Sequence, residues 1–318
     1  MNWTAEESQA GMRLDKFLTE RLSGSRSQIK KQIKAGSVLV NGKASSVHFF
    51  LKSGDVVTLT DTTATPIVQA AAVRPLLTPA VIFEDANFIV LDKPAGMLVH
   101  TTEQGEVDTL ADWLKIHCPE IESVGEHKYR AGILHRLDRE VSGVLVAAKT
   151  NQAFLHLKQQ FKEREIKKEY TALVYGKVER NGEITLPIGR SKDGKFVAHP
   201  RRGREKFLVN DRVAITRYQV VELIRDYSLL HVQILTGRTH QIRAHLAAVG
   251  HPILGDQLYG PKKTIFHLLR RRVKVVDPGR IFLHSSNLSF RNLDGEWATY
   301  AAPLPKSLTD YLNALRIN

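Results

Sequence analysis

The sequence is short of cysteine, of long apolar runs and of acidic residues, and each shortage excludes a class of protein. Its one cysteine, Cys118, rules out an internal disulfide and a cysteine-based zinc site. No apolar run reaches the roughly 18 residues that cross a bilayer, and the first residues lack the basic start and apolar core of a secretory signal. We therefore expect a cytoplasmic protein with no membrane partner.

The shortage of acid leaves a strongly basic chain. Its 318 residues include 46 Lys and Arg against 33 Asp and Glu, which gives a net charge of +13. Lysine and arginine replace the counterions condensed on phosphate groups, so this excess favours a polyanionic partner. The alternative is a basic protein whose charge only aids solubility. The 42% hydrophobic content is ordinary for a globular protein and suffices for a large core.

Residues 11–60 have the pattern of a small compact unit. Apolar residues at helical spacing predict a first helix from Leu14 to Leu22. A second helix would turn Ile29 and Ile33 inward, and Asn41-Gly42 predicts a hairpin turn after a strand over 37–40. The other faces of the second helix carry four basic residues: Arg26, Lys30, Lys31 and Lys34. These cations either contact RNA phosphates or form a solvated surface.

The composition then changes to Ala, Thr, Pro and Val between residues 61 and 80, which indicates a linker. We therefore predict a domain over 1–60, a linker over 61–80 and a larger domain over 81–318. Apolar patterns predict strands over 88–91, 143–148, 170–175 and 229–235 and helices over 151–164 and 239–249. Strands outnumber helices without regular alternation, which favours an α+β fold with a mostly antiparallel sheet.

The most informative stretch is GILHRLDREVSGVLV, residues 132–146. It places Asp138 among His135, Arg136 and Arg139, just before the predicted buried strand. Neighbouring cations favour the ionised form of a carboxyl group. An ionised aspartate on a structured loop can be a nucleophile, a general base or a salt-bridge anchor. The residues alone leave these three roles open.

The pattern H-R-L-D-x-x-x-S-G in this stretch resembles the active-site segment of the RluA-type pseudouridine synthases. Three more segments resemble that family in the same order: FIVLDKPAGMLVH (88–100), IKKEYTALVYGKV (166–178) and LHVQILTGRTHQIRAHLAAVGHPILGDQLYG (230–260). The unit over 11–60, with RLDKFL and AGSVLVNGK, resembles the S4 RNA-binding module. The resemblance implies an α+β protein: an S4-like αα-β module followed by a catalytic domain on a mixed, mostly antiparallel sheet.

The resemblance also implies roles for individual residues. Asp138 matches the catalytic aspartate, and Arg243 matches a basic active-site residue that we expect to pair with it. Tyr170 matches a tyrosine whose ring covers the uracil, and Arg136 matches an arginine that fills the space left by an extruded base. Outside these motifs, Tyr170 would be read as a core residue and the two arginines as surface or salt-bridge residues.

Two positions depart from the family pattern. Val141 stands where Thr is common, and Ser285 stands where Ala is usual, which leaves the finer details of substrate choice open. Gly237-Arg238-Thr239 precedes the predicted helix over 239–249. There Thr239 can cap the helix, and the backbone can bind a phosphate, for which an RNA phosphate is the better candidate.

The predicted reaction converts uridine to pseudouridine, which needs no redox step or phosphate transfer, so we expect no cofactor. His240 and His245 lie five residues apart rather than four, and we expect no metal site. Ribosomal RNA of the large subunit is the predicted partner, and tRNA is the alternative substrate. A non-catalytic RNA-binding or ribosome-assembly protein is the alternative from another class. We expect a monomer.

Overall fold

The computed structural model describes residues 1–22, 28–29, 32–33, 36–46, 49–60, 77–101, 108–127, 129–191, 195–198, 211–260 and 278–317. The chain divides into two compact units, Met1–Pro75 and Leu76–Asn318, and each is described by itself. Four predicted RNA-binding residues lie outside the described residues: Arg26, Lys30, Lys31 and Lys34. The predicted boundaries at 60 and 80 stay a prediction.

The N-terminal unit packs helical segments against a four-stranded antiparallel sheet. The strand order is β1 (Asn2–Thr4), β4 (Val56–Leu59), β2 (Val38–Val40) and β3 (Lys43–Ala44). Helix α1 (Leu14–Thr19) follows a short 3-10 turn, η1 (Glu7–Gln9). The predicted inward residues Ile29 and Ile33 are buried, and Asn41 and Gly42 both have positive φ, as a tight hairpin turn requires.

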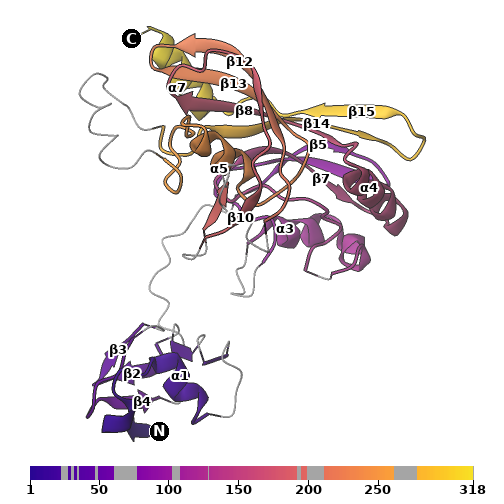
Figure 1. The fold of residues 1–318 in the computed structure, drawn as a ribbon. Helices are drawn as coiled ribbons and strands as arrows, with labels where there is room; N and C mark the ends of the chain where they lie inside the picture. Colours follow the sequence, from indigo (N-terminus) through magenta and orange to yellow (C-terminus); the bar gives the residue numbers. More distant parts are fainter. Residues whose placement is uncertain are drawn as a thin grey trace. The chain divides into compact units, whose positions relative to one another are not determined.

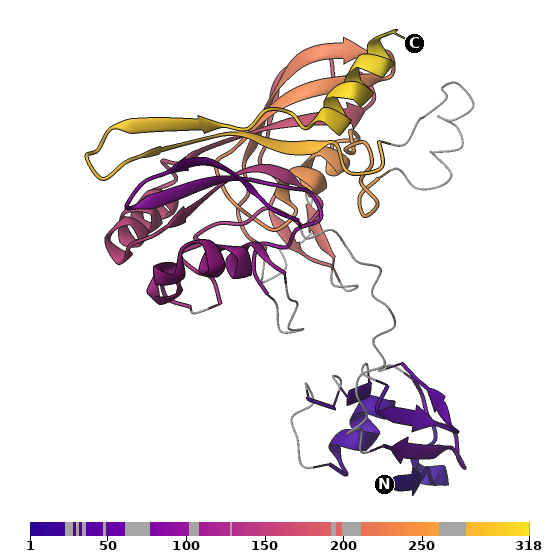
Figure 2. The same cartoon turned by 180° about the vertical axis from the view of Figure 1, so that it is seen from behind.

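The larger unit is built on one nine-stranded sheet (Figures 1 and 2). Its order is β5 (Ala80–Glu84), β6 (Phe88–Lys93), β7 (Ser142–Ala148), β14 (Leu283–Arg291), β8 (Lys167–Tyr175), β13 (Tyr227–Ile234), β12 (Thr216–Ile224) and β9 (Gly182–Ile184), with β15 (Trp297–Ala301) beside β14. Among the described strands only β7 and β14 pair in parallel. The predicted α+β class is confirmed.

Short elements complete this unit (Figure 1). They are α3 (Leu110–His117), η2 (Pro119–Ser123), α4 (Asn151–Glu163), α5 (Gln241–Ala248), α7 (Lys306–Ile317) and the pair β10 (Ile188–Arg190) and β11 (Phe196–Ala198). Helix α4 buries Phe154 and Leu157 against the core, as its spacing predicts. No helix in the described part of the chain is long and apolar enough to cross a membrane.

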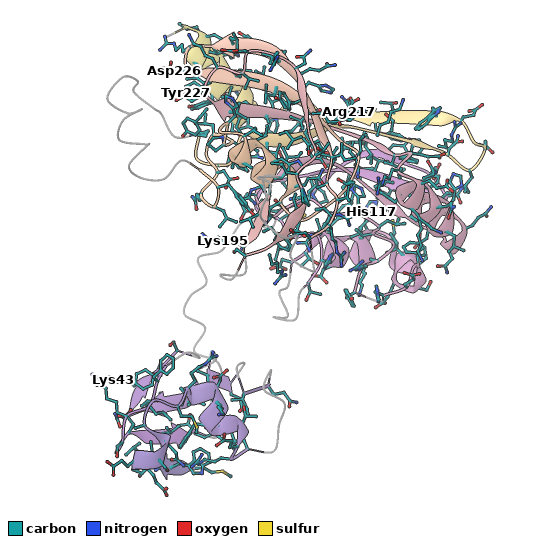
Figure 3. The ribbon with its side chains drawn as sticks, viewed as in Figure 1. Lys43, His117, Lys195, Arg217, Asp226 and Tyr227 are labelled. Carbon is teal, nitrogen blue, oxygen red and sulfur yellow. The ribbon has the colours of Figure 1, made fainter. Side chains whose placement is uncertain are left out.

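Short connections join three antiparallel pairs of the sheet: β5–β6, β12–β13 and β14–β15. Figure 3 shows Asp226 and Tyr227 together at the turn between β12 and β13, where Arg225 takes a left-handed φ of 55°. Tyr227 then points into the core and is 2% exposed. Strand β7, predicted over 143–148, is buried at all seven of its residues, which confirms a central strand.

The start of α5 differs from the prediction. Thr239 does not cap the helix, because His240 is the N-cap residue, with a left-handed φ of 56°. Gln241 satisfies the backbone there instead: its Oε1 accepts hydrogen bonds from Arg238 N at 3.0 Å and Thr236 Oγ1 at 2.8 Å. The helix start therefore has no side-chain cap, and the amide of Gln241 instead joins the preceding loop to the first helical residue. At the other end, Val249 is 41% exposed, although its spacing predicts an inward residue.

Candidate active site

A cavity of about 500 Å³ opens beside the ends of β8 and β13, the start of α5 and the loop before β7. This volume lies within the roughly 300–1,000 Å³ typical of small-molecule sites. Asp138 is the only acid among the described residues that line it. The lining also includes six cationic residues: Arg136, Lys162, Arg164, Lys168, Arg238 and Arg243. The cavity therefore suits an anionic ligand.

Asp138 lies in a tight turn at the entrance to β7. Its carbonyl oxygen accepts a hydrogen bond from Val141 N at 3.1 Å, which closes the turn just before the strand. Gly143 fixes where the strand lies, because a Cβ on it would be 2.1 Å from Ser285 O on β14. Only glycine allows β7 and β14 to approach so closely at its φ of 118°. The S-G of the motif thus sets the position of the aspartate.

Arg243 connects Asp138 to a second, fully buried acid. Its Nη1 donates to Asp138 Oδ2 at 3.0 Å, so the predicted pairing of Arg243 with Asp138 is present. Its Nε and Nη2 donate to the two oxygens of Asp256 at 2.8 and 2.9 Å. Burial opposes ionisation of Asp256, but the hydrogen bonds and charge of Arg243 outweigh it and lower the pKa of Asp256. Asp256 therefore orients the guanidinium toward Asp138.

Tyr170 lies on β8 with its side chain in the same cavity and is 5% exposed. Burial raises the pKa of Tyr170 far above its usual range, a hydrogen bond with Ser285 opposes this, and the charge of Asp138 adds to it. Its hydroxyl is therefore protonated at neutral pH. Ser285, one of the two departures from the family pattern, contacts Tyr170, and Val141, the other, lines the cavity wall.

His240 approaches Asp138 from the start of α5, with Nε2 3.7 Å from Asp138 Oδ2. Its Nδ1 lies 3.1 Å from the hydroxyl of Tyr259, which donates its own proton to Phe196 O at 2.6 Å. Nδ1 must therefore be the donor to Tyr259, and in the neutral ring Nε2 faces Asp138 without a proton. Burial lowers the pKa of His240, against the attraction of Asp138, which favours this neutral form.

Arg136 stands at the rim of the cavity and is exposed. No hydrogen bond or ion pair joins its side chain to another described residue, and an exposed, unpaired guanidinium is free to contact a ligand. The cavity therefore brings together four of the predicted site residues: Asp138, Tyr170, Arg243 and Arg136.

A buried lysine supports the turn that carries Asp138. The side chain of Lys93, at the end of β6, is fully buried, and its Nζ donates to Pro94 O, Met97 O and Arg139 O at 2.9, 2.9 and 3.3 Å. Gly96 N also donates to Arg139 O at 2.7 Å. The loop after β6 is thereby fastened to the residue next to Asp138, which limits the movement of the turn.

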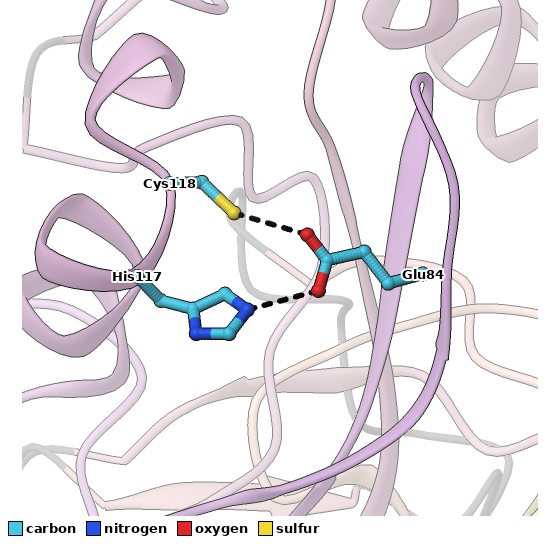
Figure 4. A group of neighbouring side chains, drawn as sticks. All are labelled: Glu84, His117 and Cys118. Atoms are coloured by element: carbon cyan, nitrogen blue, oxygen red, sulfur yellow. Dashed lines mark hydrogen bonds and ion pairs between the residues drawn. The ribbon is translucent and has the colours of Figure 1, made fainter.

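Glu84, His117 and Cys118 form the one group in the described residues with metal-ligand geometry (Figure 4). Both oxygens of Glu84 are already occupied, by His117 Nε2 at 2.9 Å and by Cys118 Sγ and Lys149 Nζ at 3.4 and 2.7 Å. The bonds from Lys149 and His117 lower the pKa of Glu84 to about 2, and burial raises that of Cys118 to about 11. The group is a closed hydrogen-bond network, and the absence of a metal stays a prediction.

Comparison with known proteins identifies the class to which this fold and cavity belong. A family model described as RNA pseudouridylate synthase matches residues 87–248, which include the whole Asp138, Tyr170 and Arg243 cluster. A model of the S4 domain matches residues 12–57. The chain therefore belongs to the RNA pseudouridine synthases, isomerases that act on RNA. Within that class it is an RluA-type enzyme with an N-terminal S4 domain, as the sequence motifs imply.

Relatives extend over almost the whole chain. An uncharacterized RNA pseudouridine synthase of Bacillus subtilis is 34% identical and covers 99% of this chain and 98% of its own length. Ribosomal large subunit pseudouridine synthase D of Nitrosomonas europaea is 35% identical, over 98% of this chain and 87% of its own. The structure of human RNA pseudouridylate synthase domain containing 4 matches with a TM-score of 0.56 and 27% identity, over 74% of this chain and 93% of its own.

Sequence reasoning missed four residues of this site: Lys93, Lys168, His240 and Asp256. Lys93, Lys168 and Asp256 stand inside the quoted segments LDKPAG, IKKEY and LGDQLYG, so the motifs contained the signal. A lysine or aspartate within an apolar stretch indicates a charge with a buried partner. Only the tertiary structure shows which partner that is.

Proposed function

We propose that this enzyme isomerises uridines of large-subunit ribosomal RNA and that Asp138 is its catalytic residue. The observation that supports this most is the single carboxylate in a cationic cavity, held at 3.0 Å by an arginine that a buried acid orients. Several relatives are named for the large ribosomal subunit, and the net charge of +13 suits a large structured RNA.

The chemistry requires that one bond break and another form on the same nucleotide. The N1–C1′ bond breaks, the uracil turns, C5 bonds to C1′, and the proton of C5 is lost while N1 gains one. Asp138 acts on the ribose or on the base, either as a nucleophile or as a proton acceptor. Arg243 holds and orients its carboxylate through the hydrogen bond at 3.0 Å. No external oxidant or group donor enters the balance, which agrees with the predicted lack of a cofactor.

Tyr170 and Arg136 serve the same step from opposite sides of the nucleotide. The ring of Tyr170 covers the uracil face. Because its hydroxyl is protonated, Tyr170 donates a hydrogen bond rather than acting as a phenolate base. A paired uridine must leave its stack to enter the cavity, which costs a few kcal/mol. Arg136, exposed at the rim, then takes the place of the extruded base.

The experiment that tests this function uses cells lacking the gene, complemented with the wild-type chain or with Asp138→Asn. Pseudouridine is mapped at nucleotide resolution in large-subunit ribosomal RNA and in tRNA. We expect positions in ribosomal RNA to lose the modification in the deletion, to regain it with wild type, and to stay unmodified with Asp138→Asn.

Purified Asp138→Asn should bind ribosomal RNA as wild type does, because the variant keeps the shape of the side chain. The matched control is Asp310→Asn, whose side chain is 59% exposed and pairs only with Lys306 on the surface of α7. Modification restored by Asp138→Asn would remove Asp138 from the mechanism. If the deletion lost pseudouridine in tRNA alone, tRNA would replace ribosomal RNA as the proposed substrate.

A further inference from the structure

The cavity has a second cationic side, away from Asp138, that the proposed catalytic residues do not use. It is formed by Lys168 on β8, Arg238 before α5 and Arg164 after α4. Burial is the first cause that lowers the pKa of Lys168 and of Arg238; the charge of Arg238 adds to the first shift, and the charges of Arg212 and Arg164 add to the second. None of the three forms an ion pair with a carboxylate in the described part of the chain, although Arg238 Nε donates to Val213 O at 3.1 Å. Cations that line one side of a cavity without an acid suit an anionic ligand.

Lys168 is the most unusual member of this group. It is 9% exposed, and no hydrogen bond or ion pair to its Nζ is found among the described residues. Its ammonium lies 5.7 Å from the centre of the Phe161 ring, and a Cβ placed on Gly237 would be 3.6 Å from Nζ. Burial and then Arg238 lower the pKa of Lys168 to about 8. The side chain is buried, but its ammonium opens into the cavity that Lys168 lines, so solvent or a bound anion must satisfy the charge there.

Two other lysines show that this state is specific. Lys93 is buried more completely, at 0% exposed, but three backbone carbonyl oxygens satisfy its ammonium. Lys167 is the chain neighbour of Lys168 and points to the opposite face of β8, where its Nζ lies 4.9 Å from the Trp297 ring centre. Because side chains alternate along a strand, Lys168 shares its face with Tyr170, two residues on. The unsatisfied ammonium thus lies on the same side of β8 as the uracil site.

We propose that Lys168 and Arg238 bind a phosphate group of the substrate RNA strand, next to the nucleotide whose base lies against Tyr170. This rests on the proposed function and adds the part of the substrate that the second side of the cavity recognises. Phosphate is the one charged group of RNA, and Gly237 leaves the space over Nζ clear for it. The phosphate would hold the nucleotide in register while Asp138 acts on its sugar or base.

The test compares Lys168→Gln and Lys168→Arg with Lys167→Gln as the matched control. The probe is large-subunit ribosomal RNA from cells lacking the gene, with pseudouridine formation followed in single-turnover reactions from pH 6.5 to 9. Losing a charged hydrogen bond weakens binding by about tenfold. Lys168→Gln should therefore raise the RNA concentration for half-maximal rate by about tenfold, and more than it lowers the maximal rate. Lys167→Gln should change neither by more than about twofold.

Salt and pH supply readouts that a structural role would not move. One phosphate contact fewer should lower the slope of log affinity against log salt by about 0.7 in Lys168→Gln. Wild-type affinity should fall above pH 8 as Lys168 loses its proton, whereas Lys168→Arg, which stays charged, should not show this fall. If Lys168→Gln unfolds, the pH profile of Lys168→Arg still decides the question.

Unchanged affinity in Lys168→Gln, or a Lys168→Arg profile that still falls above pH 8, would overturn the proposal. So would a single-turnover rate lost at every RNA concentration with affinity intact, which would make Lys168 part of the chemistry. Failure of the proposed function has a different signature. In that case the wild-type chain itself forms no pseudouridine in this RNA, whatever residue stands at 168.

Discussion

Arg243 is held along the whole edge of its guanidinium, and this makes Asp256 as important to the site as the residues that face the substrate. Asp256 has a fully buried side chain, and its Oδ1 also accepts hydrogen bonds from Leu258 N and Tyr259 N at 2.8 and 3.0 Å. The carboxylate is thus fixed by backbone on one side and fixes Arg243 on the other. The third nitrogen of the same guanidinium, Nη1, donates to Asp138 Oδ2.

Asp256→Asn should lower the rate while leaving the substrate-facing residues in place. An amide at this position turns a donor toward Arg243, so the guanidinium loses one of its two bonds and shifts. We expect the maximal rate to fall by about 10²-fold and the free energy of unfolding to fall by about 3–5 kcal/mol. Single-turnover kinetics below the unfolding temperature and urea denaturation measure the two effects.

The control for this variant is again Asp310→Asn, which removes an exposed pair worth at most about 0.5 kcal/mol. An Asp256→Asn enzyme that is destabilised but has a wild-type rate would show that Asp256 only supports the fold.

Ser285 is a second residue that contacts the site, through Tyr170. Its hydroxyl has hydrogen-bond partners in Tyr170 and in Val144 O.

At the scale of elements, two loops are bonded to each other next to Asp138 and support it. The loop after β6 and the turn before β7 meet at Arg139, whose Nε donates to Gly96 O at 3.0 Å while its own carbonyl accepts from Gly96 N. The ammonium of Lys93 donates hydrogen bonds to carbonyl oxygens of both loops. The β7–β14 contact at Gly143 fixes the strand that follows.

Lys93→Met should weaken the contact between these two loops. The methionine keeps the length and apolar stem of lysine but removes the ammonium from three carbonyl oxygens, of which, among the described residues, only Arg139 O keeps a bond, the one from Gly96 N. Each buried group left unsatisfied costs about 1–3 kcal/mol, so we expect a loss of several kcal/mol in the free energy of unfolding. We also expect a lower maximal rate, because the turn that carries Asp138 gains freedom.

Urea denaturation and single-turnover kinetics measure both effects of Lys93→Met. Lys306→Met is the control, since the Lys306 side chain is 87% exposed and pairs with Asp310 on the surface of α7. A Lys93→Met enzyme with wild-type rate and stability would mean that the two loops hold together through their backbone bonds alone.

At the scale of the whole molecule, the two units have separate hydrophobic cores. Among the described residues, the core of the larger unit contains none from 1–75, and the ten buried apolar residues of the N-terminal core lie within residues 5–57. A unit with its own core can fold without its neighbour. The S4 domain should therefore contribute to RNA affinity and not to the stability of the catalytic unit.

Removing residues 1–75 tests this division. We expect the shortened chain to unfold in one cooperative transition, at the same temperature as residues 76–318 within the full chain. It should bind ribosomal RNA at least about tenfold more weakly, with a smaller salt slope, because phosphate contacts are lost. Filter binding against salt and thermal unfolding measure these effects. Aggregation of the shortened chain, or undiminished affinity, would contradict the separation of roles.

Much of this organisation was predictable from local pattern. The strands predicted over 88–91, 143–148 and 170–175 lie inside β6, β7 and β8, and the one over 229–235 ends one residue beyond β13, because period-two alternation and apolar runs are local signals. The start of α5 was not predictable, because the helix has no side-chain cap and His240 takes a left-handed φ that no spacing rule anticipates.

The sequence by itself determined the elements, the basic character of the chain and the identity of Asp138, Tyr170 and Arg243 as candidates, since these depend on residue type and motif. Only the tertiary structure decided their partners. Arg243 and Asp138 are 105 residues apart and meet because the sheet order β7-β14-β8-β13 brings α5 over the entrance to β7. Among the described residues, the same order leaves Lys168 without an acid while Lys93 receives three carbonyls. The neighbours of a charge are set in space, and the two adjacent lysines of IKKEY lie on opposite faces of β8, one exposed and one buried.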